Sequence, residues 1–483
     1  MALHIKRSRE HVLRAGAAQA VITPPVGVFM AGWSRRLLPD NRARYVHDDL
    51  MSKALVVERA GQAWAIVAND LTAVDPVTTA QVREGIADQT DLRRESILLC
   101  GTHTHSGPVV LPIACVLSQA EMEQRSMKAD GSKPAATPGA GMAASCCYAG
   151  QVDEKWKAFF VDQAIRAGVQ AWRSMRPAEA ALGEADVSGV ASSRRVRLSD
   201  GTWGDPRIPP RPGVSVVSRT QIDPLVRVLQ IREHGSGAPL AAVVNYGCHP
   251  WVFSGSGISA ELAGTTASKV AARWQPPGAT APVVLYLTGP EGDVTTVWNT
   301  DVEHLWNVRP GEDAEDSRRR REALFWSELD RLSSRLADGA LTAMDSAGPW
   351  DSDPTVRSAI ERFSVPLKAG YDRPPEVILA DWQRAAPPSE HRTELQALRL
   401  GPLAILGLPG EPFASIGRAI RESSPLGNLL IAALANDCGE IVYVAERASY
   451  DLGGYEMESF PVAPGAGEII VERARDILTA LSS

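Results

Sequence analysis

Short apolar runs, each followed by a turn, constrain the fold of this sequence most. Residues 96–100, 240–246, 283–287 and 403–408 form four such runs, and Gly or Pro follows each of them closely. Runs of this length are typical of buried strands and are shorter than most helices. The sequence therefore predicts a sheet whose strands end in tight turns.

Longer stretches between these runs have helical character. The sequence predicts helices over residues 155–173, 263–274, 318–344, 412–422 and 468–481. Two hairpins are also expected, pairing residues 54–59 with 63–68 and residues 395–400 with 403–408, and residues 429–434 form another apolar run. Strands mixed with helices of this length predict an α/β fold with a mixed sheet at its core and flanking helices.

The chain contains no clear linker and no internal repeat. We therefore expect a short N-terminal extension, residues 1–12, and a single catalytic domain over residues 13–483. Residues 128–150 and 205–213 are rich in Ala, Gly, Ser or Pro and predict long loops, which often serve as lids or binding loops. The charged run at residues 318–322 predicts the solvated face of a helix.

Composition limits the classes of partner. The net charge of −7 over 483 residues argues against a nucleic-acid-binding surface, which is basic and clustered. No run approaches the roughly 18 apolar residues of a transmembrane helix, and the N-terminus lacks the apolar core of a secretory signal. Six Cys residues are too few for a disulfide scaffold in a chain of this length, and the absence of a Cys-x-x-Cys pair argues against a zinc site made of thiolates. We expect a cytoplasmic protein with a small-molecule substrate; a homo-oligomer is one alternative for its assembly.

Two histidines stand directly after the first apolar run, in Gly101-Thr102-His103-Thr104-His105-Ser106-Gly107-Pro108. The chain has only nine His residues, so finding two of them in one turn is notable. Imidazole is the commonest metal ligand and also suits acid–base catalysis near neutral pH. The alternative is that the pair only caps the turn or lies at the surface.

The other runs end in the same manner. The second leads to Cys248-His249-Pro250, the third to Pro290-Glu291-Gly292-Asp293-Val294-Thr295-Thr296, and the fourth to Pro409-Gly410-Glu411-Pro412. Ligands of open α/β sheets bind beyond the carboxyl ends of the strands. Two His and one Glu form a ligand set that catalytic zinc sites use. Ordinary turns and helix caps are the alternative for each segment taken alone.

The order of these motifs resembles the neutral ceramidase family. The resemblance rests on Thr-His-Thr-His-Ser-Gly-Pro at residues 102–108, Asn245-Tyr246-x-x-His249-Pro250, Gly292-Asp293-Val294 and Pro409-Gly410-Glu411, with Tyr443-Val444 ahead of Tyr455-Glu456. Weaker matches are Ile22-Thr23-Pro24-Pro25 near the start and Arg194-Arg195 in the middle region. The matching blocks extend from about Leu13 to the end of the chain.

The resemblance implies a single Zn²⁺ held by His103, His249, Glu411 and Tyr443. It also implies that His105 faces the substrate, although the His-x-His pattern by itself equally allows both rings on the metal. Tyr is an uncommon zinc ligand. Its assignment rests on the spacing of twelve residues between Tyr443 and Tyr455, which matches the ligand and the substrate-contacting Tyr of the family.

The sequence departs from ceramidases in three respects. Thr295 and Thr296 replace the Ser and Pro that follow Gly-Asp-Val in the family. The immunoglobulin-like domain at the C-terminus of ceramidases is expected to be absent, because the chain ends after the helix that begins near Glu468. No secretion signal is expected either. These departures favour a substrate other than a sphingolipid.

We interpret the chain as a zinc-dependent amidohydrolase that cleaves an N-acyl bond with metal-activated water. His105 and Tyr455 would stabilise the oxyanion or protonate the leaving group, and Thr295 would orient water or substrate, or serve only as a turn residue. His47 is a candidate neighbour of the site or a surface residue. The alternatives are an esterase or a metal-dependent lyase on the same scaffold, and a binding protein with a vestigial metal site.

Overall fold

The computed structural model describes residues 12–32, 41–115, 145–146, 151–204, 212–251, 255–297 and 311–482. Most of the predicted extension at residues 1–12 lies outside the described residues, as do most of the predicted loops at 128–150 and 205–213. The division of the chain into this extension and one domain remains a prediction.

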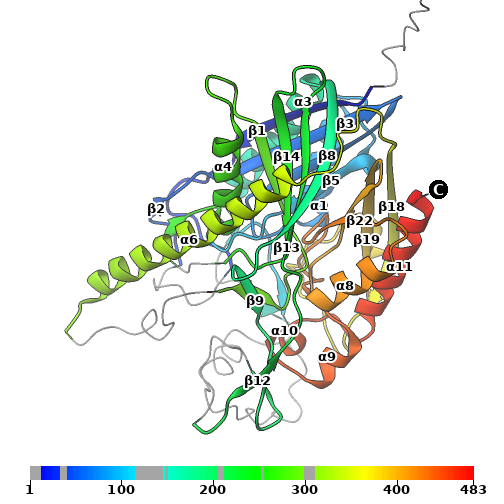
Figure 1. Cartoon of the computed structure of the whole chain (residues 1–483). Helices are drawn as coiled ribbons and strands as arrows, with labels where there is room; N and C mark the ends of the chain where they lie inside the picture. The colour runs from blue at the N-terminus through cyan, green and yellow to red at the C-terminus, as the bar shows by residue number, and fades with distance from the viewer. Residues whose placement is uncertain are drawn as a thin grey trace, which may run out of the picture.

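The largest sheet has eight strands (Figure 1). In spatial order they are β16 (Val283–Thr288), β14 (Pro239–Tyr246), β13 (Leu225–Glu233), β8 (Arg176–Asp186), β1 (Arg14–Val21), β3 (Met51–Arg59), β4 (Gln62–Asn69) and β5 (Ile97–Gly101). The pairs β14–β16 and β4–β5 are parallel, and the other pairs are antiparallel. The prediction of an α/β fold with a large mixed sheet is confirmed.

The second sheet has four strands in the order β18 (Val356–Pro366), β19 (Glu390–Leu400), β20 (Leu403–Gly407) and β22 (Asn428–Ala432). It packs face to face on the first sheet. The side chains of β3 point alternately to its two faces, and this alternation shows the packing. Leu55 and Val57 point toward the second sheet and share one hydrophobic cluster with its residues Leu398 and Ile405. Ala54 and Val56 point the other way, into a cluster with the helices.

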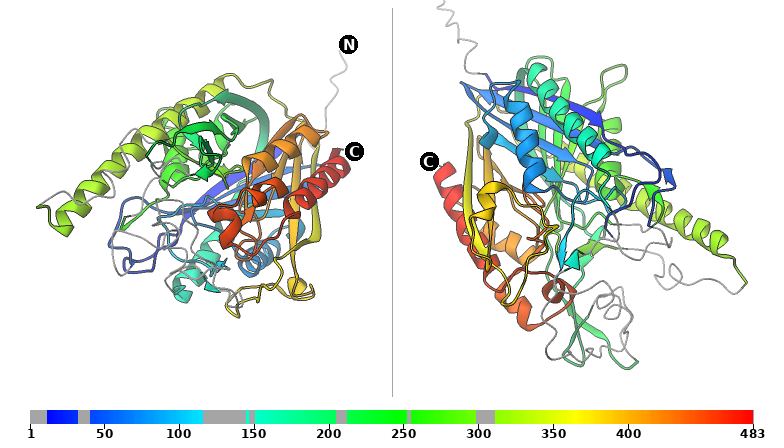
Figure 2. Two further views of the ribbon diagram at one scale, coloured as in Figure 1. Left: turned by 90° about the horizontal axis from the view of Figure 1, so that it is seen from below. Right: turned by 180° about the vertical axis from the view of Figure 1, so that it is seen from behind.

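Helices cover the outer faces of both sheets. On the first sheet lie α1 (Pro76–Ala87) and α3 (Glu154–Arg173) at one end, and α4 (Glu261–Trp274) and α6 (Ala314–Asp345) at the other. On the second sheet lie α8 (Ala414–Ser423) and α11 (Ala466–Ser482). The result is four layers, with helices outside and two sheets inside (Figure 2).

The remaining elements are short. They are β2 (Tyr45–Val46), β6 (Ala114–Cys115), β7 (Ser145–Cys146), β9 (Ala191–Ser193), β10 (Val196–Leu198), β11 (Trp203–Gly204), β12 (Val216–Arg219), β15 (Gly257–Ile258), β17 (Val294–Thr296), β21 (Glu411–Pro412), β23 (Tyr443–Val444), η2 (Arg94–Ser96), α7 (Asp381–Arg384), α9 (Arg447–Asp451) and α10 (Tyr455–Ser459).

The first sheet is curved, so that its two edge strands come together beside β22. The Thr288 hydroxyl at the end of β16 donates to the Thr102 carbonyl just after β5, at 2.8 Å. Asn245 of β14 joins the two sheets, because its side-chain amide donates to the Ile431 carbonyl at 2.8 Å and accepts from the Ile431 amide at 3.2 Å. The ends of β5, β14 and β16 therefore lie close to one another, although β5 and β16 are the first sheet's opposite edges.

The charged run in α6 differs from its prediction. Arg319 is exposed, but the Glu322 side chain is buried. Its carboxylate accepts hydrogen bonds from the Ser256 hydroxyl at 2.8 Å and the Tyr45 hydroxyl at 3.1 Å. The prediction of a solvated face is wrong for Glu322, because these hydrogen bonds attach one side of the run to β2 and to the residue before β15.

Candidate metal centre

The predicted His and Glu residues converge where the strand ends meet. His103 Nε2 and His249 Nε2 lie 3.6 and 3.2 Å from Glu411 Oε2. His105 Nε2 lies 3.2 Å from His103 Nε2. The potential ligand atoms of His103, His105 and His249 all lie within 4.8 Å of one another. Three segments far apart in the sequence thus deliver their side chains to one point.

Hydrogen bonds fix the orientation of two of these rings. His103 Nδ1 lies 2.8 Å from the Thr72 carbonyl oxygen, and His249 Nδ1 lies 2.8 Å from that of Glu291. A carbonyl can only accept, so each Nδ1 carries a proton and Nε2 is the ring atom that faces the cluster. Such a backbone partner is typical of metal-ligating histidines.

The local backbone has the strain expected of a functional site. His103 has a φ of 69°, in the left-handed region that residues with a side chain seldom adopt. Glu411 follows Gly410, whose φ is 62°, and a Cβ at Gly410 would lie 2.3 Å from the Val442 carbonyl oxygen. The turn therefore requires glycine. It sets Glu411 beside Tyr443 in the parallel pair of β21 and β23.

Electrostatics favour the protonation states that a metal ligand needs. Burial lowers the pKa of His249 to about 4, and the charge of Arg194 acts in the same direction. Burial alone would raise the pKa of Glu411, but His103 and His249 outweigh it and hold that pKa well below its usual range. Neutral imidazole and ionised carboxylate are the forms that bind metals. The buried donor set therefore fits a divalent metal ion.

The two predicted tyrosines lie next to each other. The centroids of the Tyr443 and Tyr455 rings are 6.1 Å apart, and both rings also contact Phe460 edge-on. Tyr443 is buried on the strand beside Glu411, whereas Tyr455 is 51% exposed at the start of α10. The buried position of Tyr443 is compatible with the predicted role of metal ligand, and the exposed position of Tyr455 is compatible with the predicted role of substrate contact. Those roles remain predictions.

Thr295 lies in β17, opposite Ser192 of β9. Its side chain is buried, and its hydroxyl has no hydrogen-bond partner among the described residues. A buried hydroxyl without a partner is uncommon, so a role in orienting water or substrate and a role as a turn residue both stay open.

His105 and His47 have different surroundings. His105 is partly buried, and its ring lies close enough to His103 that both predicted alternatives, metal ligand and substrate contact, stay open. The His47 ring stacks on Trp326 of α6 at 3.7 Å between centroids and pairs with Asp48. It is not in the His and Glu cluster.

Several residues around the cluster had no predicted role. Arg194 donates to the Gly292 carbonyl and pairs with Glu456 at 2.9 Å, which ties the turn after β16 to α10. Asp293 accepts from the Ala414 amide at 2.7 Å and so caps α8, which follows Glu411. Both are charged residues inside the motifs that carry the resemblance, but sequence spacing does not reveal which partners they find.

Glu291 is the most conspicuous of these residues. One of its carboxylate oxygens lies within 4.8 Å of ligand atoms of His103 and Glu411. Its side chain is fully buried. Burial, and then the charge of Glu411, raise the pKa of Glu291 well above its usual range. The sequence signal was present, because Glu291 occupies a Gly/Pro turn after an apolar strand as His249 and Glu411 do.

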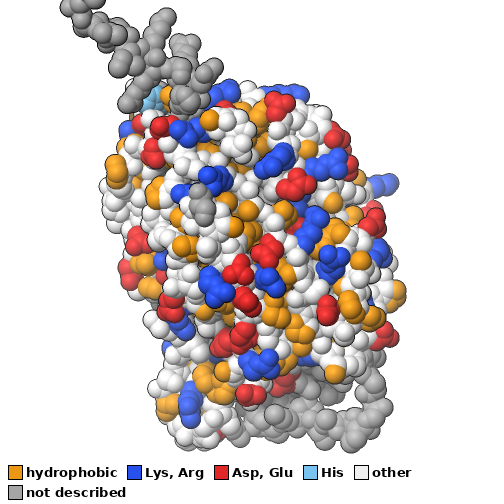
Figure 3. All heavy atoms as spheres, turned by 90° about the vertical axis from the view of Figure 1, so that its right-hand side faces the viewer, with side chains coloured by type: hydrophobic (Ala, Val, Ile, Leu, Met, Phe, Trp, Pro, Cys, Tyr) orange, Lys and Arg blue, Asp and Glu red, His pale blue; other side chains and the backbone are white. Residues whose placement is uncertain are grey.

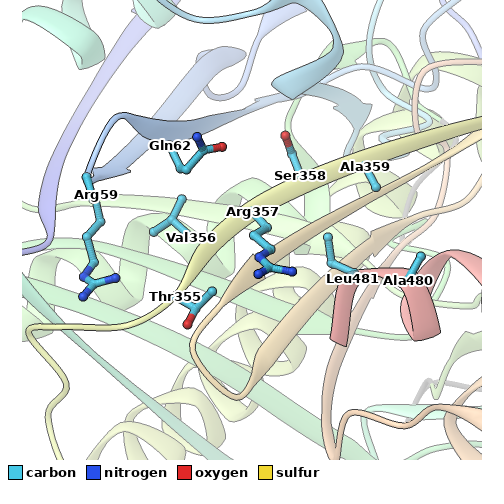
Figure 4. A pocket seen from close by; sticks show the side chains of 10 residues that line it. Arg59, Gln62, Thr355, Val356, Arg357, Ser358, Ala359, Ala480 and Leu481 are labelled. Atoms are coloured by element: carbon cyan, nitrogen blue, oxygen red, sulfur yellow. The ribbon is translucent and has the colours of Figure 1, made fainter. Parts of the chain in front are cut away.

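Other surface features lie away from this cluster. Arg59, Gln62, Val356, Arg357 and Leu481 contribute to a depression of about 490 Å³ between the first sheet, β18 and α11 (Figure 4). It includes no residue of the cluster. Acidic and basic side chains are interspersed on the face seen in Figure 3, and neither sign forms a continuous patch there. Among the described residues, no helix combines the length and apolar character needed to cross a bilayer.

The fold is that of the neutral ceramidases. The crystal structure of neutral ceramidase from Pseudomonas aeruginosa superposes with a TM-score of 0.67 at 18% identity, covering 97% of this chain and 74% of that one. A ceramidase complexed with C2 gives 0.68 at 17% identity, covering 98% and 75%. A scan against protein-family models and a search of curated proteins give no match.

Proposed function

We propose that this protein is a zinc-dependent hydrolase that cleaves the amide bond of a small, soluble N-acyl compound. The observation that carries the proposal is the convergence of His103 Nε2, His249 Nε2 and Glu411 Oε2, with both rings oriented by backbone carbonyls. The neutral ceramidase fold supports amide hydrolysis, because the ceramidases it resembles take their name from an N-acyl substrate.

Each residue of the site has a proposed role. The ion would be held by His103, His249, Glu411 and Tyr443. When bound, a zinc ion lowers the pKa of a coordinated water and polarises a carbonyl. His105, at the edge of the cluster, would donate a proton to the departing amine. Tyr455 would direct its hydroxyl to the carbonyl oxygen, where negative charge develops. Thr295 would orient the water or the substrate.

Two enzymatic alternatives use the same residues. An esterase needs the same activation of a carbonyl, and a lyase needs a base close to a polarised carbonyl. A binding protein with a vestigial site is the non-enzymatic alternative. The complete set of His103, His249 and Glu411 argues against it, because loss of function removes the constraint on such residues. We retain a cytoplasmic location as part of the proposal.

The test combines metal analysis with a substrate screen. Purified wild type should contain about one zinc per chain, and His249→Ala should lose it. His234→Ala is the matched control, because His234 lies on a hairpin away from the cluster and pairs with Glu179. Relative to the uncatalysed reaction, the wild type should accelerate hydrolysis of short N-acyl amines more than hydrolysis of matched esters. Active wild type without metal would overturn the proposal, and a larger acceleration for esters would favour the esterase.

A further inference from the structure

Glu291 is unusual among the buried carboxylates of this protein. The Glu394 carboxylate pairs with Arg83 at 2.7 Å, Glu440 with Arg373 at 2.6 Å and Glu456 with Arg194 at 2.9 Å. Within the described part of the chain, neither carboxylate oxygen of Glu291 has a hydrogen-bond partner outside its own residue, where the backbone amide lies close to the carboxyl group. Burying a carboxyl group without a partner is costly, so its persistence requires an explanation.

The backbone around Glu291 limits where this side chain can point. The Gly292 amide donates to the Pro412 carbonyl at 2.9 Å, and a Cβ at Gly292 would lie 2.4 Å from the Glu411 carbonyl oxygen. On the other side, a Cβ at Gly289 would lie 3.0 Å from the Gly247 backbone. The turn at residues 289–292 is therefore closely packed between the segment that carries His249 and the segment that carries Glu411.

Glu291 is linked to the cluster in two ways. Its carbonyl accepts the His249 Nδ1 proton at 2.8 Å and so orients that ring. Its carboxylate oxygen lies within 4.8 Å of ligand atoms of both His103 and Glu411. The nearby cation Arg194 is paired with Glu456. Two carboxyl groups thus face one point beside His103, and a divalent cation bound there would balance the charge of their ionised forms.

We infer that Glu291 is an additional ligand of the ion held by His103, His249 and Glu411. Neither the sequence motifs nor the resemblance assigns it this role. Zinc accepts carboxylate oxygens and can expand to five ligands, so Glu291 is compatible with Tyr443 on the same ion. The inference rests on the proposed metal-dependent function, and it adds a second negative charge to the donor set.

The test measures Zn²⁺ binding rather than activity. Glu291→Leu and Glu291→Gln should raise the dissociation constant for Zn²⁺ by about 100-fold or more, as determined by competition with a chelator. The expected loss is at least as large as that caused by removing a residue that only hydrogen-bonds to a metal ligand. The d–d absorption bands of the Co²⁺-loaded protein should also change. Metal-free Glu291→Leu should melt higher than metal-free wild type, by on the order of 2 °C, because an unpartnered buried carboxyl is removed.

Glu394→Gln is the matched control, because it alters a buried carboxylate that pairs with Arg83 outside the cluster. It should lower the melting temperature with and without Zn²⁺ and leave the dissociation constant unchanged. Unchanged Zn²⁺ affinity in both Glu291 variants, with His249→Ala still losing the metal, would overturn this inference alone. Wild type that binds no Zn²⁺ would overturn the proposed function as well.

Discussion

The backbone amide of His105 donates a hydrogen bond to the Glu261 carboxylate at 2.7 Å. Glu261 is fully buried, has a φ of 45° and also accepts from the Thr104 hydroxyl at 3.3 Å. The first residue of α4 therefore holds the turn that carries both histidines. A carboxylate bonded to a backbone amide in a buried setting makes one of the stronger hydrogen bonds in proteins.

Glu261→Ala should lower the free energy of unfolding by about 2–3 kcal/mol, because it leaves the buried His105 amide without its acceptor. It should also reduce kcat through displacement of the His105 ring. Glu261→Gln retains an acceptor oxygen and should recover most of both losses. Chemical denaturation and steady-state kinetics measure the two effects. Wild-type kcat in Glu261→Ala would contradict a positioning role.

The two tyrosines should respond differently to loss of their hydroxyls. Tyr443→Phe should weaken zinc binding, because Tyr443 is the predicted ligand beside Glu411. Tyr455→Phe should keep the metal and lower turnover by roughly 10²–10³-fold, the cost of losing an oxyanion donor. Metal analysis and measurement of kcat on the same preparations distinguish the loss of a metal ligand from the loss of an oxyanion donor. Loss of metal in Tyr455→Phe would show that the assignments are reversed.

Thr295→Val tests whether the buried hydroxyl takes part in the chemistry. The change preserves shape, so the fold should remain and the stability should stay level or rise by about 1 kcal/mol, since the hydroxyl has no described partner. If the hydroxyl orients water or substrate, kcat should fall by about 10²-fold, and Thr295→Ser should stay active. Full activity in Thr295→Val would indicate a turn residue only.

A buried His391 should make stability depend on pH. His391 Nε2 lies 2.8 Å from Asp437 and its Nδ1 lies 2.7 Å from Glu440. Burial acts to lower the pKa of His391, but these two carboxylates outweigh it and raise the pKa to about 9.

Because the folded protein binds this proton more tightly than the unfolded chain does, the stabilisation is complete below the ordinary pKa of 6.5 and is lost as pH rises through 9. The stability difference between wild type and His391→Gln should therefore shrink by on the order of 3 kcal/mol from pH 6 to 9.5. Denaturation at several pH values measures it. A constant difference would mean that His391 does not titrate in this range.

Substrate size is the last prediction. We expect weak or no activity on long-chain ceramide and higher kcat/KM on short, soluble acyl compounds. A site that buries an acyl chain gains about 0.8 kcal/mol per methylene, so a lipid enzyme improves steadily as the chain lengthens. A graded series of N-acyl substrates measures the trend. A steady rise in kcat/KM with chain length would restore a ceramidase-type substrate.

The sequence was most informative where strands are strongly apolar. β14, β16 and the β3–β4 hairpin lie within a few residues of their predicted positions. β1, β8 and α1 were missed, because β1 and β8 are rich in Ala and Gly and α1 has only a weak amphipathic pattern. Such segments gain their structure from neighbours rather than from local preference.

The convergence of His103, His249 and Glu411 follows from strand ends and turns, which local patterns reveal. The contribution of Glu291 does not, because a glutamate in a turn is ordinary until its lack of a partner is known. The same holds for Glu261, whose role depends on a hydrogen bond to a residue 156 positions away. Tyr443 is predicted as a ligand only through the family resemblance, since tyrosine is an unusual zinc ligand.

The closure of the first sheet against β22 has a consequence for synthesis of the chain. β5 is made early, yet its outer edge pairs with Leu434 and Asn436, and the Asn245 amide pairs with Ile431. Until that late segment leaves the ribosome, the outer edge of β5 lacks Leu434 and Asn436, and the Asn245 side chain lacks its two hydrogen bonds to Ile431. Exposed edges of this kind promote aggregation. Fragments that end before β22 should therefore depend on chaperones to remain monomeric.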